Sequence, residues 1–584
     1  MIYLLFFILF SFEEKNPAIL YLKSQIALDE ENYKKAGEYL EKALEANNSS
    51  PFLKLELAKV LSYEEKFQEA LKVLENFSPP DNLLQSYYSL KFYLYLMLND
   101  IEDALKAYEK IKEMKISKEN LSFLVEAIQK NLLKYLSEEK PDNSIKLLQI
   151  YSKYFPKEIK IQEALINLYI ETGNLEEIKK ILNTMEINEN TYTIIINLFS
   201  YLLQKNDCSS ILNLSSSFKD LNNEDLLSIL SYCLLKSGEI EDAKNIIQKI
   251  LSLNPNNFDA LRVLLEIKII EGEYKEAEGL IKLMPKEKEE QVNYIRESEG
   301  VLFQIQGRYK EAEDIYLKLL GKFESKEKIK ILRKIYYFYK GIGDCFKALE
   351  YAYKLLDEDP EDVFSYYRLA EAYLILKDIE NGLFFLNIYK EKGEKGAIID
   401  VIWLLLEYNY LNEAEVFIEE MGSYEKELEQ KNQILGFYYF KKGNLQKMEE
   451  VLKRDGENPS SLNLLGYFLI EKDQRIDEAI SFIEKALKSE PNNGSFLDSL
   501  GWGYYKKGDL EKAYYFLKKA NFLEPYNGTI LSHFGDVCLK SGKYYEALLR
   551  YKQALSFQVP DMPDVLKKIE DLLKKYPYEG LSQF

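Results

Sequence analysis

The side-chain types of a hydrolytic triad occur together once in this 584-residue chain, at Ser532, His533 and Asp536, around its single histidine. A serine activated in this way needs a base and an orienting acid that converge on one reacting atom. Residues at positions i, i+1 and i+4 of one helix cannot converge in that geometry, because adjacent side chains do not face each other. We therefore interpret His533 as a structural histidine packed between helices and predict no catalytic residues.

Other signals for chemistry are weak. The four cysteines are too few and too scattered for a disulfide framework, and no C-x-x-C pair offers zinc-ligand or redox spacing. Acidic pairs such as Glu64-Glu65 and Glu289-Glu290 are adjacent, so they do not share a helix face and are expected to be solvated. No phosphate-binding G-x-x-x-x-G-K-[ST] occurs. The sequence predicts no metal site, no cofactor and no enzyme activity.

The charge balance limits the partners. Lys and Arg number 77 against 96 Asp and Glu, which gives a formal net charge of −19. Nucleic-acid binding draws its affinity from clustered cations that release counterions from phosphates. An acidic chain of this kind is not expected to bind nucleic acid, and other proteins become the expected partners.

The first twelve residues, MIYLLFFILFSF, are almost entirely apolar. This run is about half a membrane span. Its length fits the apolar region of a secretory signal, but a basic start and a small-x-small cleavage site are missing, and no cysteine lies nearby to take a lipid. Two interpretations stay open: an exported protein with a mis-assigned start, or a cytoplasmic chain with an apolar first helix. No other segment approaches the length of a membrane span.

A period of about 34 residues runs through the rest of the chain. It appears when the small residue that follows an aromatic or aliphatic residue by three positions is aligned, as in Tyr33-x-x-Ala36 and Phe67-x-x-Ala70. The aligned positions are Ala36, Ala70, Ala104, Ser144, Ile178, Ile211, Ala243, Ala277, Ala312, Ala348, Gly382, Ala414, Met448, Ala479, Ala513 and Ala547. The sequence therefore predicts sixteen repeats.

The residues of one period fit two antiparallel helices. Seven glycines follow an apolar-periodic run, where a left-handed residue ends a helix without a Cβ penalty. These glycines are Gly238, Gly272, Gly307, Gly343, Gly443, Gly508 and Gly542. Small residues on the first helix let the paired backbones approach closely. They are Gly300, Gly436, Gly466, Gly501 and Gly535. Each pair leaves an apolar face that the next pair must cover, so we predict an all-α, right-handed solenoid.

The repeats are uneven along the chain. Residues 1–16 are the apolar, signal-like segment, and residues 17–223 form an N-terminal arm whose repeats are degenerate after about residue 112. The polar stretch 206–223 predicts a bend near residue 215, because Ser and Asn compete with helical hydrogen bonds. Residues 224–558 form a C-terminal superhelix, and residues 559–584 a capping helix and tail. No separate catalytic domain fits.

The array resembles tetratricopeptide-repeat proteins over about residues 17–576. The C-terminal units LLGYFLIEKDQRIDEAISFIEKAL, FLDSLGWGYYKKGDLEKA and SHFGD, within residues 464–536, resemble secreted or outer-membrane tetratricopeptide lipoproteins of Gram-negative bacteria. Some of those proteins are adaptors that deliver envelope substrates to carboxyl-terminal processing proteases. The chain departs from them in having no lipidation cysteine near its start.

The resemblance also implies a binding surface. In such repeats the first helices line an inner groove, and the position after the small residue faces it. Here that position holds Tyr93, Tyr232, Tyr337, Trp403, Phe437, Tyr467 and Trp502. Aromatic side chains are efficient binding anchors, although they also pack between repeats. Three nearby residues would add polar selectivity or else be solvated: Asp498, Lys506 and Asp536.

We therefore expect a non-catalytic scaffold or adaptor that binds extended or helical protein segments in its groove, in the bacterial periplasm or cell envelope. A cytoplasmic assembly scaffold, or a repeat appendage of an enzyme such as a glycosyltransferase, is the alternative.

Overall fold

The computed structural model describes residues 16–137, 140–186, 188–218, 222–394, 396–422, 430–557 and 562–576. The signal-like segment therefore lies outside the described residues except for Asn16. The described residues form 33 α-helices and one short 3-10 helix, η1 (Asp81–Leu83), and no strand occurs among them. The prediction of an all-α solenoid is confirmed.

The chain divides into two compact units. The first contains the described residues up to Tyr201 and the short stretch 216–218; the second contains Leu202–Ser215 and the described residues from 222 onward. The division falls within one helix, α12 (Glu189–Gln204).

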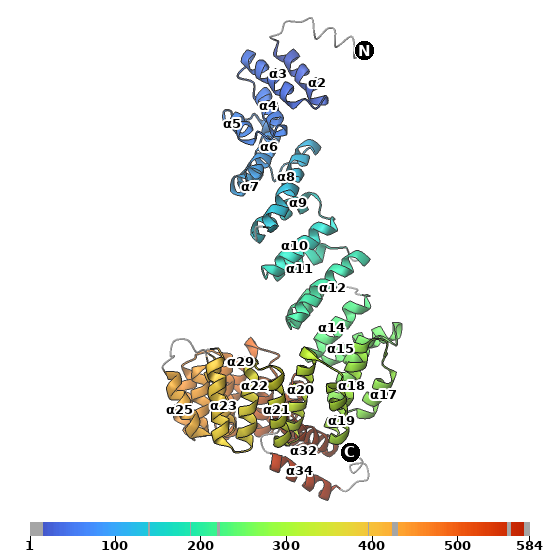
Figure 1. The fold of residues 1–584 in the computed structure, drawn as a ribbon, viewed down its shortest axis with the longest axis vertical. Coiled ribbons are helices and arrows are strands. Elements are labelled where there is room, and N and C mark those ends of the chain that lie inside the picture. The colour runs from blue at the N-terminus through green and yellow to red at the C-terminus, as the bar shows by residue number, and fades with distance from the viewer. Residues whose placement is uncertain are drawn as a thin grey trace. The chain divides into compact units, whose positions relative to one another are not determined.

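The first unit is a series of antiparallel helix pairs that follow one another along the chain (Figure 1). Its helices are α2 (Pro17–Asp29), α3 (Tyr33–Ala46), α4 (Pro51–Tyr63), α5 (Phe67–Glu75), α6 (Leu84–Met97), α7 (Ile101–Glu109), α8 (Lys118–Ser137), α9 (Pro141–Tyr154), α10 (Ile159–Glu171), α11 (Leu175–Thr184) and most of α12.

The second unit continues with the same kind of pair. It contains α13 (Cys208–Ser215), α14 (Glu224–Lys236), α15 (Ile240–Leu253), α16 (Phe258–Glu271), α17 (Tyr274–Leu283), α18 (Glu289–Ile305), α19 (Tyr309–Leu320), α20 (Ser325–Gly341), α21 (Cys345–Glu358), α22 (Val363–Ile375), α23 (Ile379–Lys392), α24 (Ala397–Glu407), α25 (Leu411–Met421), α26 (Lys431–Lys441), α27 (Leu445–Lys453), α28 (Pro459–Glu471), α29 (Ile476–Ser489), α30 (Gly494–Lys507), α31 (Leu510–Leu523), α32 (Gly528–Lys540), α33 (Tyr544–Leu555) and α34 (Met562–Lys575).

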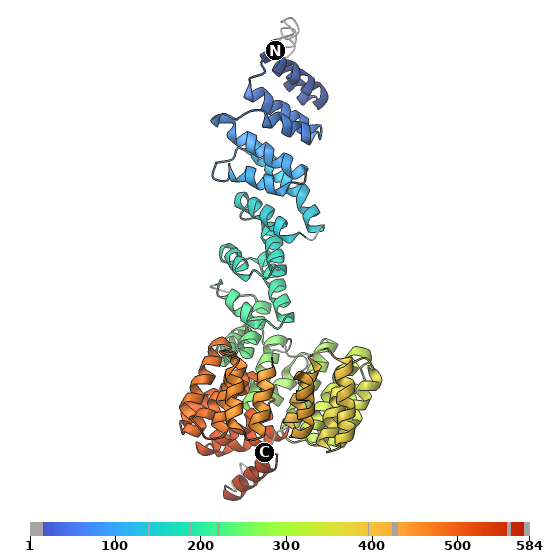
Figure 2. The ribbon, with the colours of Figure 1, turned by 90° about the vertical axis from the view of Figure 1, so that its left-hand side faces the viewer.

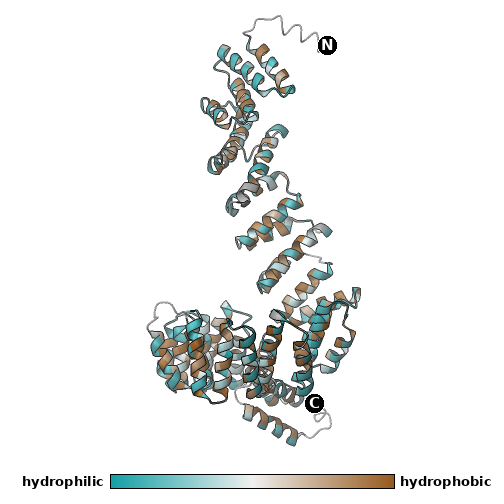
Figure 3. Cartoon of the chain, in the orientation of Figure 1, coloured by the Kyte–Doolittle hydropathy of each residue, from teal (hydrophilic) through white to brown (hydrophobic). Residues whose placement is uncertain are grey.

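The sixteen aligned positions of the repeat lie one in the second helix of each of sixteen pairs, from Ala36 in α3 to Ala547 in α33. All sixteen are buried. On the first helices the predicted small residues face the same crossing. A Cβ built on Gly436 would lie 2.5 Å from Leu452, and one on Gly535 would lie 2.5 Å from Tyr551. Hydrophobic residues recur along the helices of both units (Figure 3).

The turn between the two helices of a pair has a left-handed residue, as predicted. All seven predicted glycines have positive φ, for example 90° at Gly508. In other pairs the same place holds a residue with a side chain, such as Lys377 (φ 63°) or Asp473 (φ 51°). The left-handed conformation therefore recurs in more of these turns than glycine does.

A disulfide joins Cys208 at the start of α13 to Cys233 in α14. The sequence did not predict this pair, because two cysteines separated by 25 residues carry no spacing signal. The bond ties the short helix α13 to its neighbour within the second unit.

The second unit closes on itself. Its first helix pairs meet its last ones (Figure 2). Buried hydrogen bonds join residues more than 250 positions apart in sequence at this contact. The Nη1 of Arg550 donates to the carbonyl of Ile270 at 2.7 Å, and Gln553 Nε2 donates to the hydroxyl of Tyr274 at 3.0 Å. We call this contact the seam.

A second set of bonds continues the seam. The amide of Gln304 donates to the carbonyl of Ser556, and the hydroxyl of Ser556 donates back to the carbonyl of Gln304, both at 2.9 Å. A Cβ on Gly341 would lie 2.6 Å from the Ser556 carbonyl oxygen. The seam therefore depends on close backbone approach as well as on buried polar partners.

The close crossing of the paired helices gives a test of the repeat assignment. Ala277→Leu should destabilise the second unit by about 1–3 kcal/mol, because the added atoms overpack a fully buried crossing. The control is Gly279→Ala in the same helix, where an added Cβ meets nothing within 4 Å. That change should be neutral or stabilising by up to about 1 kcal/mol. Equal thermal unfolding curves for Ala277→Leu and the parent would contradict the assignment.

Candidate functional site

The first helices of the second unit form its inner surface. Along part of the second unit consecutive first helices contact one another: α14 contacts α16, and α24, α26, α28, α30 and α32 contact one another in series. Among the described residues, no consecutive second helices contact to a comparable extent. In a curved stack the helices on the inside of the curve are the closer ones. We call the surface formed by α14, α16 and the following first helices the inner surface.

Aromatic rings contact one another across neighbouring first helices on this surface. The Trp403 ring in α24 lies 5.2 Å from the Phe437 ring in α26, measured between centroids, and Phe437 lies 5.7 Å from Phe468 in α28. Trp403 and Phe437 are partly exposed, while Phe468 is buried. The Lys441 ammonium lies 5.2 Å from the Phe437 centroid. Trp403 and Phe437 therefore form a continuous, accessible aromatic surface.

Tyr337 lies in a cavity of about 250 Å³ that is also lined by Phe364, Tyr367, Arg368 and Asp400. Tyr337 and Phe364 are 53% and 55% exposed, so their rings are open to a partner. The cavity thus combines accessible aromatic rings with one cationic and one anionic side chain.

The charged side chains of this cavity are held in place from within the protein. Arg368 is buried and shares the Asp362 carboxylate with Arg333, at 3.3 and 3.1 Å. The carboxylate of Asp400 accepts from the Tyr389 hydroxyl at 2.6 Å. The geometry of the cavity is therefore fixed before any partner arrives.

A buried carboxylate, Glu371 in α22, connects this helix to α20 and to the end of α24. It accepts hydrogen bonds from the hydroxyls of Tyr336 at 2.7 Å and Tyr408 at 3.3 Å, and it pairs with Lys340. Desolvation, together with the negative charge of Glu371, raises the pKa of the nearby Glu407. The buried carboxylate of Glu371 is therefore held by protein partners, whereas Glu407 is exposed to solvent.

Tyr467 and Asp498 come together farther along, where they line a more polar cavity of about 220 Å³ with Ser495 and Asn527. Asp498 is buried, and its carboxylate lies 3.0 Å from Nδ1 of His533 in α32. The histidine therefore connects two consecutive first helices, as the sequence interpretation expected of a structural residue.

Two aromatic rings stack on Trp502. Its ring stacks on Tyr505 at 4.7 Å and on His533 at 4.2 Å, and its indole nitrogen donates to Glu471 at 2.6 Å. Lys506, 5.6 Å from the Trp502 centroid, pairs with Asp473 at 3.1 Å. Trp502 is partly exposed, but its ring is already stacked and hydrogen-bonded within the protein.

Asp536 bonds to the last two helices of the solenoid, α33 and α34. It accepts from the Tyr551 hydroxyl at 2.6 Å and pairs with Lys568 of α34 at 2.7 Å. Val565, Ile569 and Leu572 of α34 are buried, so this helix covers the last pair. The carboxylate of Asp536 is therefore already engaged within the protein.

Sequence reasoning missed part of this surface. Phe364, Arg368 and Asp400 do not occupy the position after the small residue, so the repeat alignment passed over them. The sequence marks them only as residues of first helices near those of Tyr337 or Trp403. Their shared cavity becomes apparent only when the helices are stacked. Whether any of the predicted groove residues binds a partner stays a prediction.

The described residues contain neither a candidate membrane-spanning helix nor a candidate metal site. No helix there is both long enough and apolar enough to span a membrane. Within the same ranges, no group of three or more His, Cys, Asp or Glu side chains is placed to hold a metal ion.

Family models match three parts of the chain. Two models described as "Tetratricopeptide repeat" match residues 17–50 and 222–296, and one described as "Anaphase-promoting complex, cyclosome, subunit 3" matches residues 472–554. Residues 17–50 and 222–296 therefore match the repeat that the period predicts. The finer resemblance to envelope lipoproteins stays a prediction.

Two curated proteins are similar in sequence. The TPR repeat-containing protein PA4667 of Pseudomonas aeruginosa is 39% identical over 77 residues, which are 12% of this chain and 13% of that protein. The chain thus spans only a small part of it. The TPR repeat-containing protein MJ1428 of Methanocaldococcus jannaschii is 24% identical over 496 residues, 79% of this chain and 74% of that one.

Solved structures with a related helical architecture include the APC/C hetero-tetramer Cut9–Hcn1, at 15% identity and a TM-score of 0.30 over 95% of this chain and 96% of that one. Another is Naa15/Naa10 bound to HypK-THB, at 14% identity and a TM-score of 0.26 over 96% of this chain and 99% of that one.

The His533–Asp498 pair predicts a pH dependence. Burial lowers the pKa of His533, but the charge and hydrogen bond of Asp498, with Asp536 and Glu471, outweigh it, so the pKa is raised above its usual value. A raised histidine pKa adds stability that is fully present below the unfolded-state pKa of about 6.5 and is lost as pH rises through the folded-state pKa.

Thermal unfolding of the full chain should therefore show a melting temperature that falls as pH rises from about 6 through neutrality, and His533→Gln should flatten that slope. Because the chain has one histidine, no other imidazole contributes. An identical slope in the variant would show that the pair does not set the pH dependence.

Proposed function

We propose that the second unit is a non-catalytic scaffold that binds extended or helical segments of other proteins along its inner surface between α20 and α30. The observation that carries this proposal is the set of exposed or partly exposed rings on first helices: Tyr337 in α20, and Trp403 and Phe437, which contact each other, in α24 and α26. Rings with few torsions supply large contact area at low entropic cost, which makes them the usual anchors of protein interfaces.

The charges beside those rings support the same role. Desolvation lowers the pKa of Lys441 while the charge of Glu407 opposes that shift, and Lys441 makes no ion pair within 4.0 Å in the part of the chain that the structure describes. The ammonium of Lys441 is incompletely hydrated. A partner carboxylate near it would form a charge-assisted hydrogen bond that replaces the missing hydration. The surface therefore offers polar selectivity next to its aromatic anchors.

We further propose that the chain works in the cell envelope, as an adaptor of the kind its C-terminal repeats resemble. The Cys208–Cys233 disulfide supports this compartment, because disulfides persist in oxidising surroundings and are rare in the cytosol. The alternative is a cytoplasmic scaffold whose two thiols stay reduced.

Removal of the ring anchors tests the binding surface. A peptide selected from a random library for binding to the full chain should bind Trp403→Ala and Phe437→Ala about 30-fold more weakly, which corresponds to about 2 kcal/mol for each anchor. Fluorescence polarisation of the labelled peptide gives the affinities, and circular dichroism checks that the helices remain.

The matched control is Phe346→Ala. Phe346 is 76% exposed on α21, a second helix, so its removal takes away an equally large apolar side chain from outside the inner surface. It should leave peptide affinity unchanged. Equal losses for Phe346→Ala and Trp403→Ala would contradict the inner-surface proposal.

The compartment has its own test. In protein isolated after thiol blocking from the organism that makes this chain, mass spectrometry should find the Cys208 and Cys233 peptides joined. Reduction should then speed amide hydrogen exchange in α13, because the bond that ties it to α14 is gone. Blocked, unjoined thiols in freshly lysed cells would favour the cytoplasmic alternative.

A further inference from the structure

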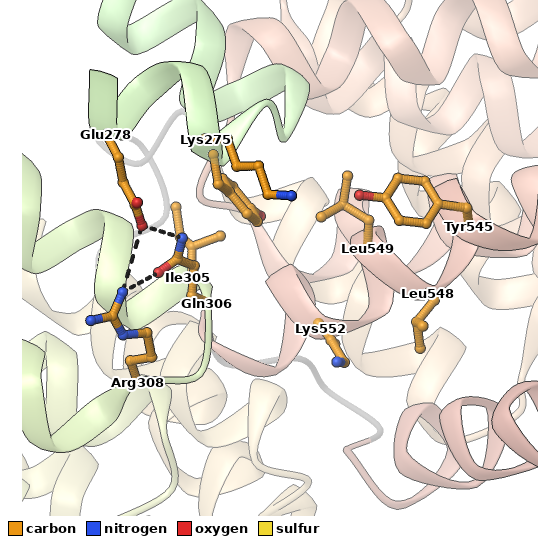
Figure 4. Close-up of a pocket in the computed structure, with 10 residues that line it drawn as sticks. Lys275, Glu278, Ile305, Gln306, Arg308, Tyr545, Leu548, Leu549 and Lys552 are labelled. Atoms are coloured by element: carbon orange, nitrogen blue, oxygen red, sulfur yellow. Dashed lines mark hydrogen bonds and ion pairs between the residues drawn. The ribbon is translucent and has the colours of Figure 1, made fainter. Parts of the chain in front are cut away.

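A cavity of about 370 Å³ opens at the seam, away from the rings of the inner surface. One wall comes from α17 and from the turn between α18 and α19, and the other comes from α33 (Figure 4). The two walls are more than 230 residues apart in sequence, since Tyr545 follows Arg308 by 237 residues, and are held together by the seam bonds of Arg550, Gln553 and Ser556. A molecule bound here would contact helices from both ends of the second unit.

The floor of the cavity is apolar. Ile305 contributes from α18, and Leu548 and Leu549 from α33, with the Tyr274 ring beside them. The volume lies within the range of small-molecule sites, which bury most of a ligand against apolar side chains and fix it with a few polar groups.

The polar groups on the first wall satisfy one another. Gln306 Nε2 donates to Glu278 at 3.2 Å, and Arg308 Nη1 donates to the Gln306 oxygen at 3.1 Å (Figure 4). Arg308 also donates to Glu311 at 2.6 Å through Nε. This wall is therefore preformed and neither demands nor excludes a charged ligand.

The opposite wall is different, because Lys552 is half-buried and has no carboxylate within 4.0 Å among the described residues. Burial alone lowers the pKa of Lys552. Lys275 lines the same cavity, and Figure 4 shows its ammonium directed toward Leu549 and Tyr545. An anion beside Lys552 would offset its desolvation, and a hydrocarbon body would cover the leucine floor.

We propose that this cavity is a binding site for a carboxylate carried on an apolar body, with the carboxylate on Lys552 and the apolar body on Leu548, Leu549 and Ile305. The site is independent of the inner surface, so its failure would leave the scaffold proposal untouched. The ligand contacts both walls, and these come together only when the second unit is folded and closed at the seam. Binding therefore also stabilises that folded unit against unfolding.

The probe is octanoate, titrated calorimetrically into the full chain, with 1-octanol as its uncharged counterpart. Octanoate should bind at one site, raise the melting temperature, and bind more tightly than octanol. Lys552→Gln should weaken octanoate about 10-fold, as expected for loss of one charge-assisted contact, and leave octanol unchanged. The matched control is Lys518→Gln, which removes an exposed lysine of α31 and should change neither affinity.

Circular dichroism shows that the variants are folded before they are titrated. Octanoate binding that is equal in the parent and Lys552→Gln, or octanol binding as tight as octanoate, would overturn the proposal. Competition with an acetylated tetrapeptide that ends in leucine, used as the free acid and as the amide, identifies whether the natural carboxylate is a protein C-terminus or a small molecule. If the acid outcompetes octanoate, the carboxylate belongs to a chain end; if it does not, the ligand is a small molecule.

Discussion

The close crossing of two helices at one small residue is the contact on which the rest of the structure depends. At Gly436 or Gly535 a single added Cβ would collide with Leu452 or Tyr551 of the partner helix. Because each pair is locked in this way, its remaining apolar side has one orientation, and only another pair of the same shape can cover it. The curvature of the stack and the position of the inner-surface rings follow from that repeated geometry.

The seam adds a constraint that a linear array lacks. In an open solenoid each repeat contacts only its neighbours, and stability is close to a sum of repeats and interfaces. Here Arg550 and Gln553 bond to Ile270 and Tyr274 from 279 or 280 residues away, so the ends of the second unit support each other. A closed turn also presents the inner surface in one fixed curvature, which lowers the ordering cost when a segment binds.

Local repetition explains why the fold was predictable. The period, the buried position typified by Ala277 and the left-handed turn at residues such as Gly508 are each encoded within one repeat, so the sequence displays them many times. The pairing of Trp403 with Phe437 was also predictable, since both occupy the same place in successive repeats.

Other features could not be predicted because they depend on accumulated curvature. The seam, its cavity and the packing of Gly341 against Ser556 arise only when many small rotations bring distant pairs together. The Cys208–Cys233 bond is likewise a matter of helix placement rather than spacing. Trp502 differs from Trp403 for a local reason: the next first helix supplies His533, which covers a ring face that the repeat pattern alone leaves open.

The two tryptophans make the central claim directly measurable. In a Trp502→Phe variant, Trp403 is the single remaining indole, and it lies among the inner-surface rings. Titration with a bound peptide should shift the emission of Trp403 to shorter wavelength as its surface is buried, along the same binding curve that fluorescence polarisation gives. Full binding of the peptide with unchanged Trp403 emission would contradict the claim that partners bind the inner surface.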